Sequence, residues 1–339
     1  MELTNAVWSA ERANLWWAKL PWLVGCNYVT SDAVNDVQMW QKETFHPQLI
    51  RKELAIARSI GMNSVRVFLS YTVWAQEQQA FLDTFEEFLS IADECGMLVM
   101  PILFDDCAFD GIDPVYGPQP EPTPGVHNSR WVPSPGFRIQ DDPAKQASLR
   151  EYVHALVGAH REDKRIVVWD LFNEPGNSDR VTSCLPLLVN AFRWAREVAP
   201  TQPLTACVWD FSERADGINQ VLLALSDVNS IHLYLDGKQT REKVSQLQLL
   251  RKPILITEWL HRPNGNTIPD LLPWMKEQKI GAWQWGMIQG KTQTNLNWNT
   301  MGPSGTPDPN PELWQHDILH PDGSPYREEE IALYKSLAE

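Results

Sequence analysis

The sequence predicts an α/β protein folded as a single (β/α)8 TIM barrel, and three observations lead to this prediction. Short apolar runs alternate with amphipathic helical segments along the whole chain, which is typical of parallel strands joined by crossover helices. Eight such runs are present, and eight parallel strands close a TIM barrel. The 339 residues exceed the roughly 250 of a minimal barrel, and no break in composition marks a second domain. We therefore expect one domain over residues 1–339, with long loops after strands 3 and 8.

Each predicted strand is a run rich in β-branched and other apolar residues. The eight predicted strands cover residues 23–28, 64–69, 98–104, 166–172, 204–210, 230–235, 253–259 and 281–288. Between them, residues 46–61 have a proline near the start and a glycine at the end, residues 81–96 end in glycine, and Asp142 with Pro143 opens residues 142–160. Further helices are expected at residues 180–199, 212–226, 240–251, 268–278 and 325–338.

Two connections are too long for simple turns. Residues 105–141, rich in proline and glycine, follow the third predicted strand, and residues 289–324 follow the eighth. In a TIM barrel both would emerge at the carboxyl ends of the strands, where barrel enzymes have their active sites. We expect these loops to wall in a pocket there; the alternative for the first loop is a disordered insertion.

The charge excludes two classes of partner. Acidic residues number 43 and basic residues 29, which gives a formal net charge of −14, and no local basic patch is present. Nucleic acids and anionic membranes repel such a chain, so we expect neither as a partner. The N-terminus lacks the basic-then-apolar order of a signal peptide. We expect a cytoplasmic protein, or a secreted one if a signal peptide has been removed, and make no prediction of its oligomeric state.

No motif indicates a cofactor or a metal. The five cysteines are widely spaced without a C-x-x-C pair, and the eight histidines include no H-E-x-x-H motif. The segment GMIQGKT, residues 286–292, has one residue too few between its glycines for a phosphate-binding loop. We therefore expect chemistry carried by side chains alone, without a cofactor.

Two strand-end glutamates carry the strongest chemical signal. Glu174 lies in WDLFNEP at the end of the fourth predicted strand, and Glu258 lies in ITEWLHR at the end of the seventh. They are 84 residues apart, or three βα units of 28 residues, so both should lie on one rim of the barrel and face each other. Two carboxyl groups across a polar cleft are what glycoside hydrolysis requires. One protonates the leaving oxygen, and the other attacks the anomeric carbon or activates water, depending on their separation.

At these positions the sequence resembles the (β/α)8 retaining glycosidases of clan A, most closely the cellulase-type glycoside hydrolase family 5. The resemblance rests on the Asn-Glu-Pro tripeptide after the fourth strand and on the glutamate after the seventh, and it extends over all eight strands. It implies that Glu174 is the general acid/base, that Glu258 is the nucleophile, and that Asn173 binds the sugar 2-hydroxyl.

Further positions match the family pattern. By the resemblance, Arg66 corresponds to the strand-two arginine that keeps the nucleophile ionised, and a purely structural salt bridge is the alternative. His232 and Tyr234 alternate on the sixth strand and therefore point the same way. The resemblance implies that Tyr234 hydrogen-bonds the nucleophile and that His232 lines the sugar site; the alternative for His232 is a core histidine.

The chain contains 16 tryptophans, an unusually large number. Tryptophan serves protein cores, and its broad face also stacks on sugar rings. The family pattern places a tryptophan platform on the eighth strand, which is matched by Trp285 or by Trp283, since alternation points both inward. Four more tryptophans follow strands or lie in loops at the carboxyl face, and we expect about two of them to bind sugar: Trp74, Trp131, Trp209 and Trp259.

The chain departs from the family at the end of the third strand. Many members carry histidines there, whereas this sequence has Phe104-Asp105-Asp106. Asp105 or Asp106 could recognise particular sugar hydroxyls, because an ionised carboxylate accepts strong hydrogen bonds. The alternative is that both aspartates cap the loop that follows.

Together these features predict a retaining β-glycoside hydrolase that cleaves β-linked oligo- or polysaccharides by double displacement through a covalent glycosyl-enzyme. The two long loops favour exo action or action on short oligosaccharides. Endo action as a β-mannanase, xylanase or β-glucanase is the first alternative. Transglycosylation and a non-catalytic carbohydrate-binding barrel are the others, and neither the sugar nor the linkage is predicted.

Overall fold

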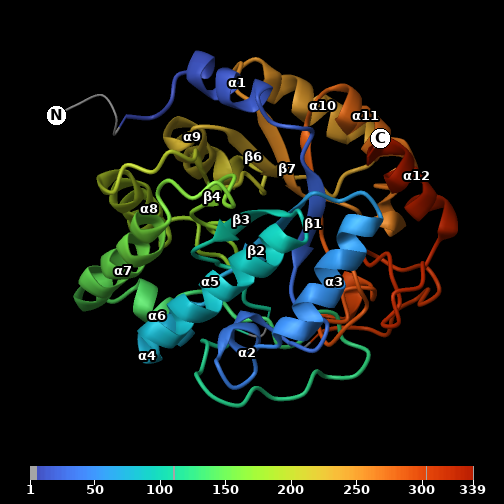
Figure 1. The fold of residues 1–339 in the computed structure, drawn as a ribbon, viewed down its shortest axis with the longest axis horizontal. Coiled ribbons are helices and arrows are strands. Elements are labelled where there is room, and N and C mark those ends of the chain that lie inside the picture. Colours follow the sequence, from blue (N-terminus) through green and yellow to red (C-terminus); the bar gives the residue numbers. More distant parts are fainter. Residues whose placement is uncertain (1–5, 110, 303, 339) are drawn as a thin grey trace.

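The computed structural model describes residues 6–109, 111–302 and 304–338, and its centre is a barrel of parallel strands (Figure 1). The strands are β1 (Val24–Tyr28), β2 (Ser64–Phe68), β3 (Leu98–Ile102), β4 (Trp169–Asp170), β5 (Leu204–Thr205), β6 (Asn229–His232), β7 (Ile254–Glu258) and β8 (Gly281–Gln284). They are hydrogen bonded in the order β5-β4-β3-β2-β1-β8-β7-β6. A parallel bridge between Val208 and Ile231 joins the two ends of this series and closes the ring. Each strand overlaps the run predicted for it, so the predicted TIM barrel is confirmed.

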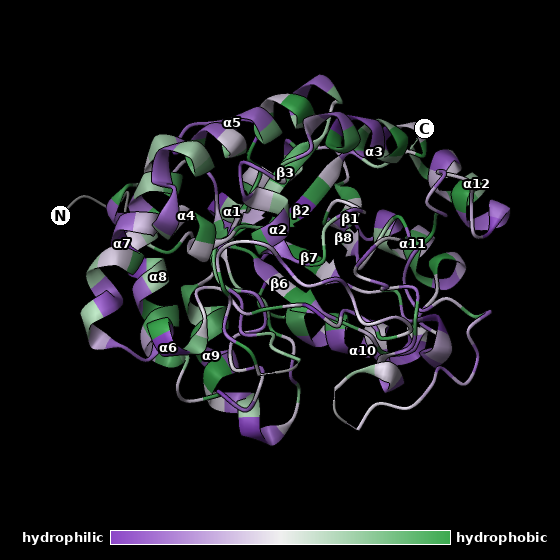
Figure 2. Cartoon of the chain, turned by 90° about the horizontal axis from the view of Figure 1, so that it is seen from below, coloured by the Kyte–Doolittle hydropathy of each residue, from purple (hydrophilic) through white to green (hydrophobic). Residues whose placement is uncertain are grey.

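Helices surround the barrel between successive strands (Figure 1). They are α1 (Ala10–Ala18), α2 (Asp36–Trp40), α3 (Pro47–Ser59), α4 (Tyr71–Gln76), α5 (Gln78–Glu94), α6 (Phe137–Gln140), α7 (Gln146–Val153), α8 (Leu185–Glu197), α9 (Asp216–Leu225), α10 (Gly237–Gln248), α11 (Ile268–Glu277) and α12 (Glu328–Ala338). In Figure 2 they carry both green and purple segments, as expected of helices with one face on the sheet and the other in solvent. None of the described helices combines the length and hydrophobicity that crossing a membrane requires.

Helix α1, which the sequence analysis did not predict, covers the amino-terminal end of the barrel. The amide of Trp8 donates to Asp227 at 2.8 Å, just before β6, and the indole of Trp17 donates to the carbonyl of Lys279 at 2.9 Å, just before β8. Both tryptophans belong to a buried apolar cluster that includes Trp283 and residues of the strands and the turns before them: Leu23, Met100, Val167, Val168, Val228 and Leu255. This cluster fills the floor of the barrel.

The main hydrophobic core lies between the strands and the surrounding helices. Trp40 of α2, for example, packs edge-on against Phe85 and Phe88 of α5, with ring centroids 5.9 and 5.3 Å apart. Trp74 and Trp259 are buried in the same core. Packing therefore accounts for a large part of the tryptophan content.

The two long loops predicted after strands 3 and 8 are present, and they contact each other. The β3 loop is residues 103–136 and the β8 loop is residues 285–327, and the described residues of both, which exclude 110 and 303, contain no α-helix or named strand. The side-chain amide of Gln293 in the β8 loop donates to the carbonyls of Thr123 and Val126 in the β3 loop, at 2.8 and 2.9 Å. The first loop is therefore ordered against the second and is not a disordered insertion.

The junction of these loops lies above β1 and β2, because those two strands separate β3 from β8 in the barrel. Contacts to the β1 side support this position. The amide of Lys291 in the β8 loop donates to the carbonyl of Ser31 at 2.8 Å, and the side chain of Asn35 donates to the carbonyl of Arg130 in the β3 loop at 2.8 Å. One side of the barrel mouth is thus covered.

Candidate active site

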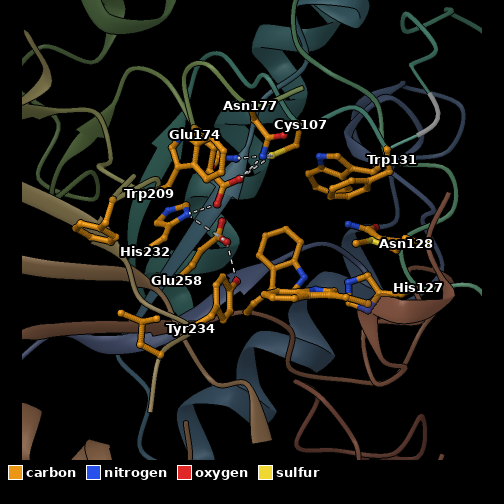
Figure 3. A pocket seen from close by; sticks show the side chains of 17 residues that line it. Cys107, His127, Asn128, Trp131, Glu174, Asn177, Trp209, His232, Tyr234 and Glu258 are labelled. Atoms are coloured by element: carbon orange, nitrogen blue, oxygen red, sulfur yellow. Dashed lines mark hydrogen bonds and ion pairs between the residues drawn. The ribbon is translucent and has the colours of Figure 1, made fainter. Parts of the chain in front are cut away.

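The main pocket lies at the carboxyl ends of the strands (Figure 3). Its volume is about 360 Å³, towards the lower end of the roughly 300–1,000 Å³ that small-molecule sites occupy. Side chains following β4, β5, β6, β7 and β8 contribute to its walls, together with the β3 loop. Aromatic residues predominate among the described lining residues, and Glu174 and Glu258 are the only acidic ones.

Glu174 and Glu258 meet across this pocket (Figure 3). Glu258 is the last residue of β7, and Glu174 lies in the turn after β4 with a left-handed φ of 42°. Such a conformation is strained for a residue other than glycine and is common at functional sites. One carboxylate oxygen of each glutamate lies within 4.8 Å of the other. Retaining glycosidases hold their carboxyl groups about 5–5.5 Å apart, whereas inverting ones need roughly 6.5–9.5 Å.

Glu258 is held by three side chains. Its Oε1 accepts a hydrogen bond from Arg66 at 3.0 Å, and its Oε2 accepts one from the Tyr234 hydroxyl at 2.7 Å. Nδ1 of His232 lies 3.3 Å from the same Oε2. The predicted nucleophile therefore has a cation on one oxygen and a neutral donor, the Tyr234 hydroxyl, on the other, an arrangement that fixes the orientation of a carboxylate.

Arg66 sits in the middle of β2 with its side chain wholly buried beneath the pocket. Its guanidinium contacts Asp170 at 2.8 Å as well as Glu258, and it donates to the side-chain oxygens of Asn27 at 2.6 Å and Asn173 at 2.7 Å. The planar fork of arginine is suited to holding several acceptors at once. Both interpretations of Arg66 thus meet in one network, since it is a structural ion pair and also contacts the predicted nucleophile.

Glu174 is held by a different set of neutral groups. Its Oε1 lies 2.7 Å from Nδ1 of His232, and its Oε2 accepts hydrogen bonds from the Asn177 amide at 2.6 Å and the Cys107 thiol at 3.2 Å. His232 therefore stands between the two glutamates. No cation contacts Glu174 among the described residues.

Burial raises the pKa of both glutamates. At Glu258 the Arg66 guanidinium and the Tyr234 hydroxyl oppose this rise, because both stabilise the charged carboxylate. Arg66 contacts Glu258 and not Glu174, so the stronger local stabilisation by a cation falls on the charged form of Glu258. Burial lowers the pKa of His232 to about 3, so this ring is neutral at pH 7. A neutral imidazole can donate from Nδ1 without adding charge between the carboxyl groups.

Three of the predicted tryptophans line the pocket. Trp285 stands edge-on to Phe68 and to Trp131, with ring centroids 5.6 Å apart in both pairs. Trp209 lies at the opposite end, where its indole donates to the carbonyl of Pro175 at 3.0 Å (Figure 3). Trp131 and Trp209 are two of the four tryptophans of which about two were expected at the sugar site.

The remaining tryptophan candidates do not line the pocket. The side chain of Trp259 is fully buried in the main core, because the residue after Glu258 faces away from the pocket, and Trp74 is buried in the same core. Trp283 is the inward residue one pleat below Trp285 and is part of the barrel floor. Of the two candidates on β8, only Trp285 lines the pocket.

Asp105 and Asp106 do not line the pocket. Asp105 is buried and accepts hydrogen bonds from the Trp131 indole at 2.7 Å and the Asn173 amide at 2.8 Å. Asp106 is buried too and accepts from the amide of Gly176 at 2.8 Å. Of the two alternatives that the sequence left open, these contacts favour the structural one, in which both carboxylates hold the loops that follow β3 and β4.

Several pocket residues were not predicted from the sequence: Cys107, Phe109, His127, Asn128, Asn177, Phe211 and Trp298. Asn177 and Cys107 had a usable signal, since each lies within three residues of a position already singled out, Glu174 and Asp105. His127 and Asn128 lie far along the β3 loop, and no periodicity or motif marks them.

A metal ion is not needed to explain this cluster. Donor atoms of Glu174, His232 and Glu258 lie within 4.8 Å of one another, close enough to share a cation. Those atoms are already hydrogen bonded to one another or to Arg66, Tyr234 and neighbouring groups.

The comparison with known proteins supports the class of fold. No protein-family model and no curated protein sequence matches the chain. Solved structures of (β/α)8 glycoside hydrolases do match, at 11 to 14% identity. At these identities the likeness establishes the fold.

Three of these structures are informative. A GH5_18 protein of Streptomyces cattleya, solved with Manβ1-4GlcNAc, has a TM-score of 0.63 and 11% identity over 93% of this chain and 80% of its own. An endo-β-1,4-mannanase of Thermotoga petrophila has a TM-score of 0.59 and 13% identity, over 93% of this chain and 76% of its own. A glycoside hydrolase family 5 mannosidase of Rhizomucor miehei has a TM-score of 0.58 and 13% identity, over 94% of this chain and 93% of its own. The group named here is the one that the sequence motifs resemble.

Proposed function

We propose that this protein is a retaining β-glycosidase that removes a neutral sugar from the end of a β-linked oligosaccharide or glycoside. One observation carries the proposal: carboxylate oxygens of Glu174 and Glu258 lie within 4.8 Å across a pocket, and only Glu258 contacts a cation. A close pair with one ionised and one protonated member is what double displacement requires.

In the first step, Glu258 attacks the anomeric carbon while Glu174 gives its proton to the departing oxygen. The glycosidic bond breaks and an ester forms between the sugar and Glu258. In the second step, the ionised Glu174 takes a proton from water, which attacks the same carbon and releases Glu258. The donors Asn177, Cys107 and His232 stabilise the carboxylate form of Glu174 between the two steps.

Exo action is supported by the junction of the two long loops. Hydrogen bonds between the β3 and β8 loops cover the mouth above β1 and β2, and residues at this junction line one end of the pocket. An endo-acting enzyme needs a cleft open at both ends to admit a continuing chain. A covered end and a volume of about 360 Å³ favour a terminal sugar with a short aglycone.

A neutral sugar is supported by the charge of the lining. Glu174 and Glu258 are the only charged side chains among the described lining residues, and no lysine or arginine is present to bind a uronic acid or a sugar phosphate. β-Mannosides are the first substrates to test, because a mannosidase, an endo-mannanase and a protein bound to Manβ1-4GlcNAc share the fold.

Nitrophenyl β-glycosides of mannose, glucose, galactose and xylose test the proposal with the wild-type protein and the Glu258→Gln variant. We expect the wild type to release nitrophenol from at least one of them and the variant to be at least about 10⁴-fold slower, because the nucleophile is lost. Proton NMR of the sugar at early times should show the β-anomer first. An α-anomer or equal rates for both proteins would contradict the double displacement.

A second measurement separates exo from endo action. Digestion of β-1,4-mannohexaose, or of the oligosaccharide of whichever sugar reacts, should yield the monosaccharide from the first time point. Early release of di- and trisaccharides without monosaccharide would show an endo-acting enzyme. If the enzyme is endo-acting, removal of the Gln293 side chain, which joins the two loops, should change the product pattern little.

A further inference from the structure

Two polar residues of the β3 loop, His127 and Asn128, face the pocket at the end opposite Trp209 (Figure 3). Each is only 1% exposed. The β8 loop holds their backbone, since the amide of His127 donates to the Thr300 hydroxyl at 2.9 Å and that of Asn128 to the Thr292 carbonyl at 2.7 Å. Their side chains are therefore presented from a fixed backbone.

His127 offers the pocket a hydrogen-bond acceptor. Its Nδ1 lies 2.8 Å from the carbonyl oxygen of Leu296, so Nδ1 carries the hydrogen and Nε2 carries a lone pair. Burial lowers the pKa of this ring to about 4, which keeps it neutral at pH 7. No group of the described residues hydrogen-bonds to Nε2. The acceptor is therefore available to a ligand.

Asn128 offers an amide oxygen that the described residues leave without a partner. Its Oδ1 is buried and makes no hydrogen bond among the described residues. The residue has a left-handed φ of 49°, which asparagine tolerates better than most residues. Buried amide oxygens are nearly always hydrogen bonded, so an unpaired one that lines a pocket indicates a missing ligand group. None of the steps proposed for Glu174 and Glu258 uses either residue.

The position of His127 and Asn128 in the pocket determines which part of a bound sugar lies next to them. The anomeric carbon must lie between the two glutamates, and the leaving group lies towards Trp209, which is bonded to the turn that carries Glu174. The ring positions farthest from the anomeric carbon then point to the opposite end. Those positions carry hydroxyl groups in a neutral pyranose, which can donate to Nε2 of His127 and both donate to and accept from the amide of Asn128.

We propose that His127 and Asn128 form the specificity wall of the glycone site and bind free hydroxyls of the terminal sugar remote from its anomeric carbon. This inference rests on the proposed glycosidase activity and deepens it. It assigns the ligand as a neutral sugar with unsubstituted hydroxyls on C3, C4 or C6, and it gives a chemical reason for exo action, because a chain continuing through one of these oxygens would lack the donor.

The test uses the nitrophenyl glycoside that the wild type hydrolyses best, together with its 3-deoxy, 4-deoxy and 6-deoxy analogues. For the wild type, we expect kcat/KM to fall by about tenfold or more for at least one analogue, because a buried polar group loses its partner. In Asn128→Gly, which keeps the left-handed backbone, and in His127→Phe, which keeps the ring, the parent should become as slow as that analogue.

A control variant separates recognition from loop structure. Gln293→Asn weakens the junction of the same two loops without placing an atom in the pocket. It should slow the parent and the deoxy glycosides by one common factor. If Asn128→Gly and His127→Phe also slow all of them by a common factor, the two residues are structural and the proposal is wrong.

Failure of the glycosidase proposal gives a different result. In that case the wild type hydrolyses none of the parent glycosides, and the test passes to calorimetric titration of Glu258→Gln with the parent and deoxy sugars. Weaker binding of one deoxy sugar, abolished in the Asn128→Gly background, would still support the specificity wall. Equal binding of all the sugars, or no binding, would overturn it.

Discussion

The two ends of the barrel are built from the same strands and have opposite chemistry. At the amino-terminal end an apolar cluster that includes Trp283 fills the barrel, and helix α1 covers it. At the carboxyl end the inward positions hold Arg66, Asp170 and Glu258 in one buried ionic network. Trp283 and Trp285, two residues apart on one chain segment, belong to different ends. Both side chains face inward, so their depth along the barrel axis, and not the side of the strand, divides the floor from the pocket.

The difference extends to titration. The carboxyl groups whose pKa is raised by burial include several on or near the carboxyl-end loops: Asp36, Asp105, Asp106, Glu174, Glu258 and Asp317. At the amino-terminal end, the buried carboxyl group of Asp227 is paired with Arg196 at 2.9 Å. Buried charge is unfavourable unless it is paired, so the carboxyl end reduces the stability that the floor provides.

Arg66→Met has the largest expected effect on this comparison, because it leaves the buried carboxyl groups of Asp170 and Glu258 without their cation. Removing one partner of a buried ion pair costs about 3–5 kcal/mol. We expect the free energy of unfolding to fall by about that much and hydrolysis to be lost. Denaturant unfolding measures the first effect and nitrophenol release the second. A variant as stable as the wild type would show that the network is not fully buried in solution.

Trp283 and Trp285 allow the floor and the pocket to be compared within one chain segment. Trp283→Ala should lower the free energy of unfolding by about 3–5 kcal/mol, because it leaves a cavity in the floor, with kcat of the folded protein unchanged. Trp285→Ala should destabilise less and lower kcat/KM by about tenfold to a hundredfold. Urea unfolding and steady-state kinetics of both variants provide the check. Equal loss of activity in the two would refute the division between floor and pocket.

Asp36→Asn tests whether the carboxyl end reduces stability at neutral pH. Burial raises the pKa of Asp36 from 3.8 to about 7, and neither carboxylate oxygen has a partner among the described residues. The folded state therefore binds this proton more tightly than the unfolded state, so wild-type stability declines as the pH rises from about 4 to about 7. We expect the variant to melt several degrees higher at pH 8 and nearly with the wild type at pH 4.5. A constant difference would contradict the assignment.

Cys107→Ala has the smallest expected effect. The thiol donates to Glu174 and so lowers the pKa of that carboxyl group, against the larger effect of burial. Without the thiol, Glu174 should keep its proton to higher pH, and the basic limb of kcat/KM should move upward by less than about one pH unit. Cys107→Ser, which keeps a donor, should leave the limb near its wild-type position. A downward shift in the alanine variant would exclude this role.

Much of the barrel could be predicted from the sequence. Each strand is a short apolar run of its own, and the positions that end those runs fall at one rim, so Asn173, Glu174 and Glu258 could be placed together. The contacts of Arg66 and Tyr234 with Glu258 were implied by the family resemblance. Helix α1 escaped prediction because its apolar residues face a partner, the barrel floor, that exists only after the strands have closed.

The loops and the tryptophans show the limit of sequence patterns. The path of the β3 loop depends on bonds to Gln293 and Thr292, more than 160 residues away along the chain, so nothing local indicated that His127 and Asn128 would reach the pocket. Tryptophan suits cores and sugar sites alike, which is why Trp259 was misassigned. The aspartates after β3 show the same ambiguity, since a carboxylate suits a loop amide as well as a ligand.

A pocket covered at one end sets the order in which molecules pass through it. The bonded β3 and β8 loops leave the Trp209 side as the approach to the sugar that, in the proposed mechanism, Glu258 would hold. The leaving group must then depart before water can arrive, and an alcohol resting beside Trp209 would take the place of that water. Water and an alcohol would thus compete for the same position beside Trp209 once the leaving group has gone, and the winner would decide between hydrolysis and sugar transfer. The time that the leaving group stays there would limit the rate of the second step.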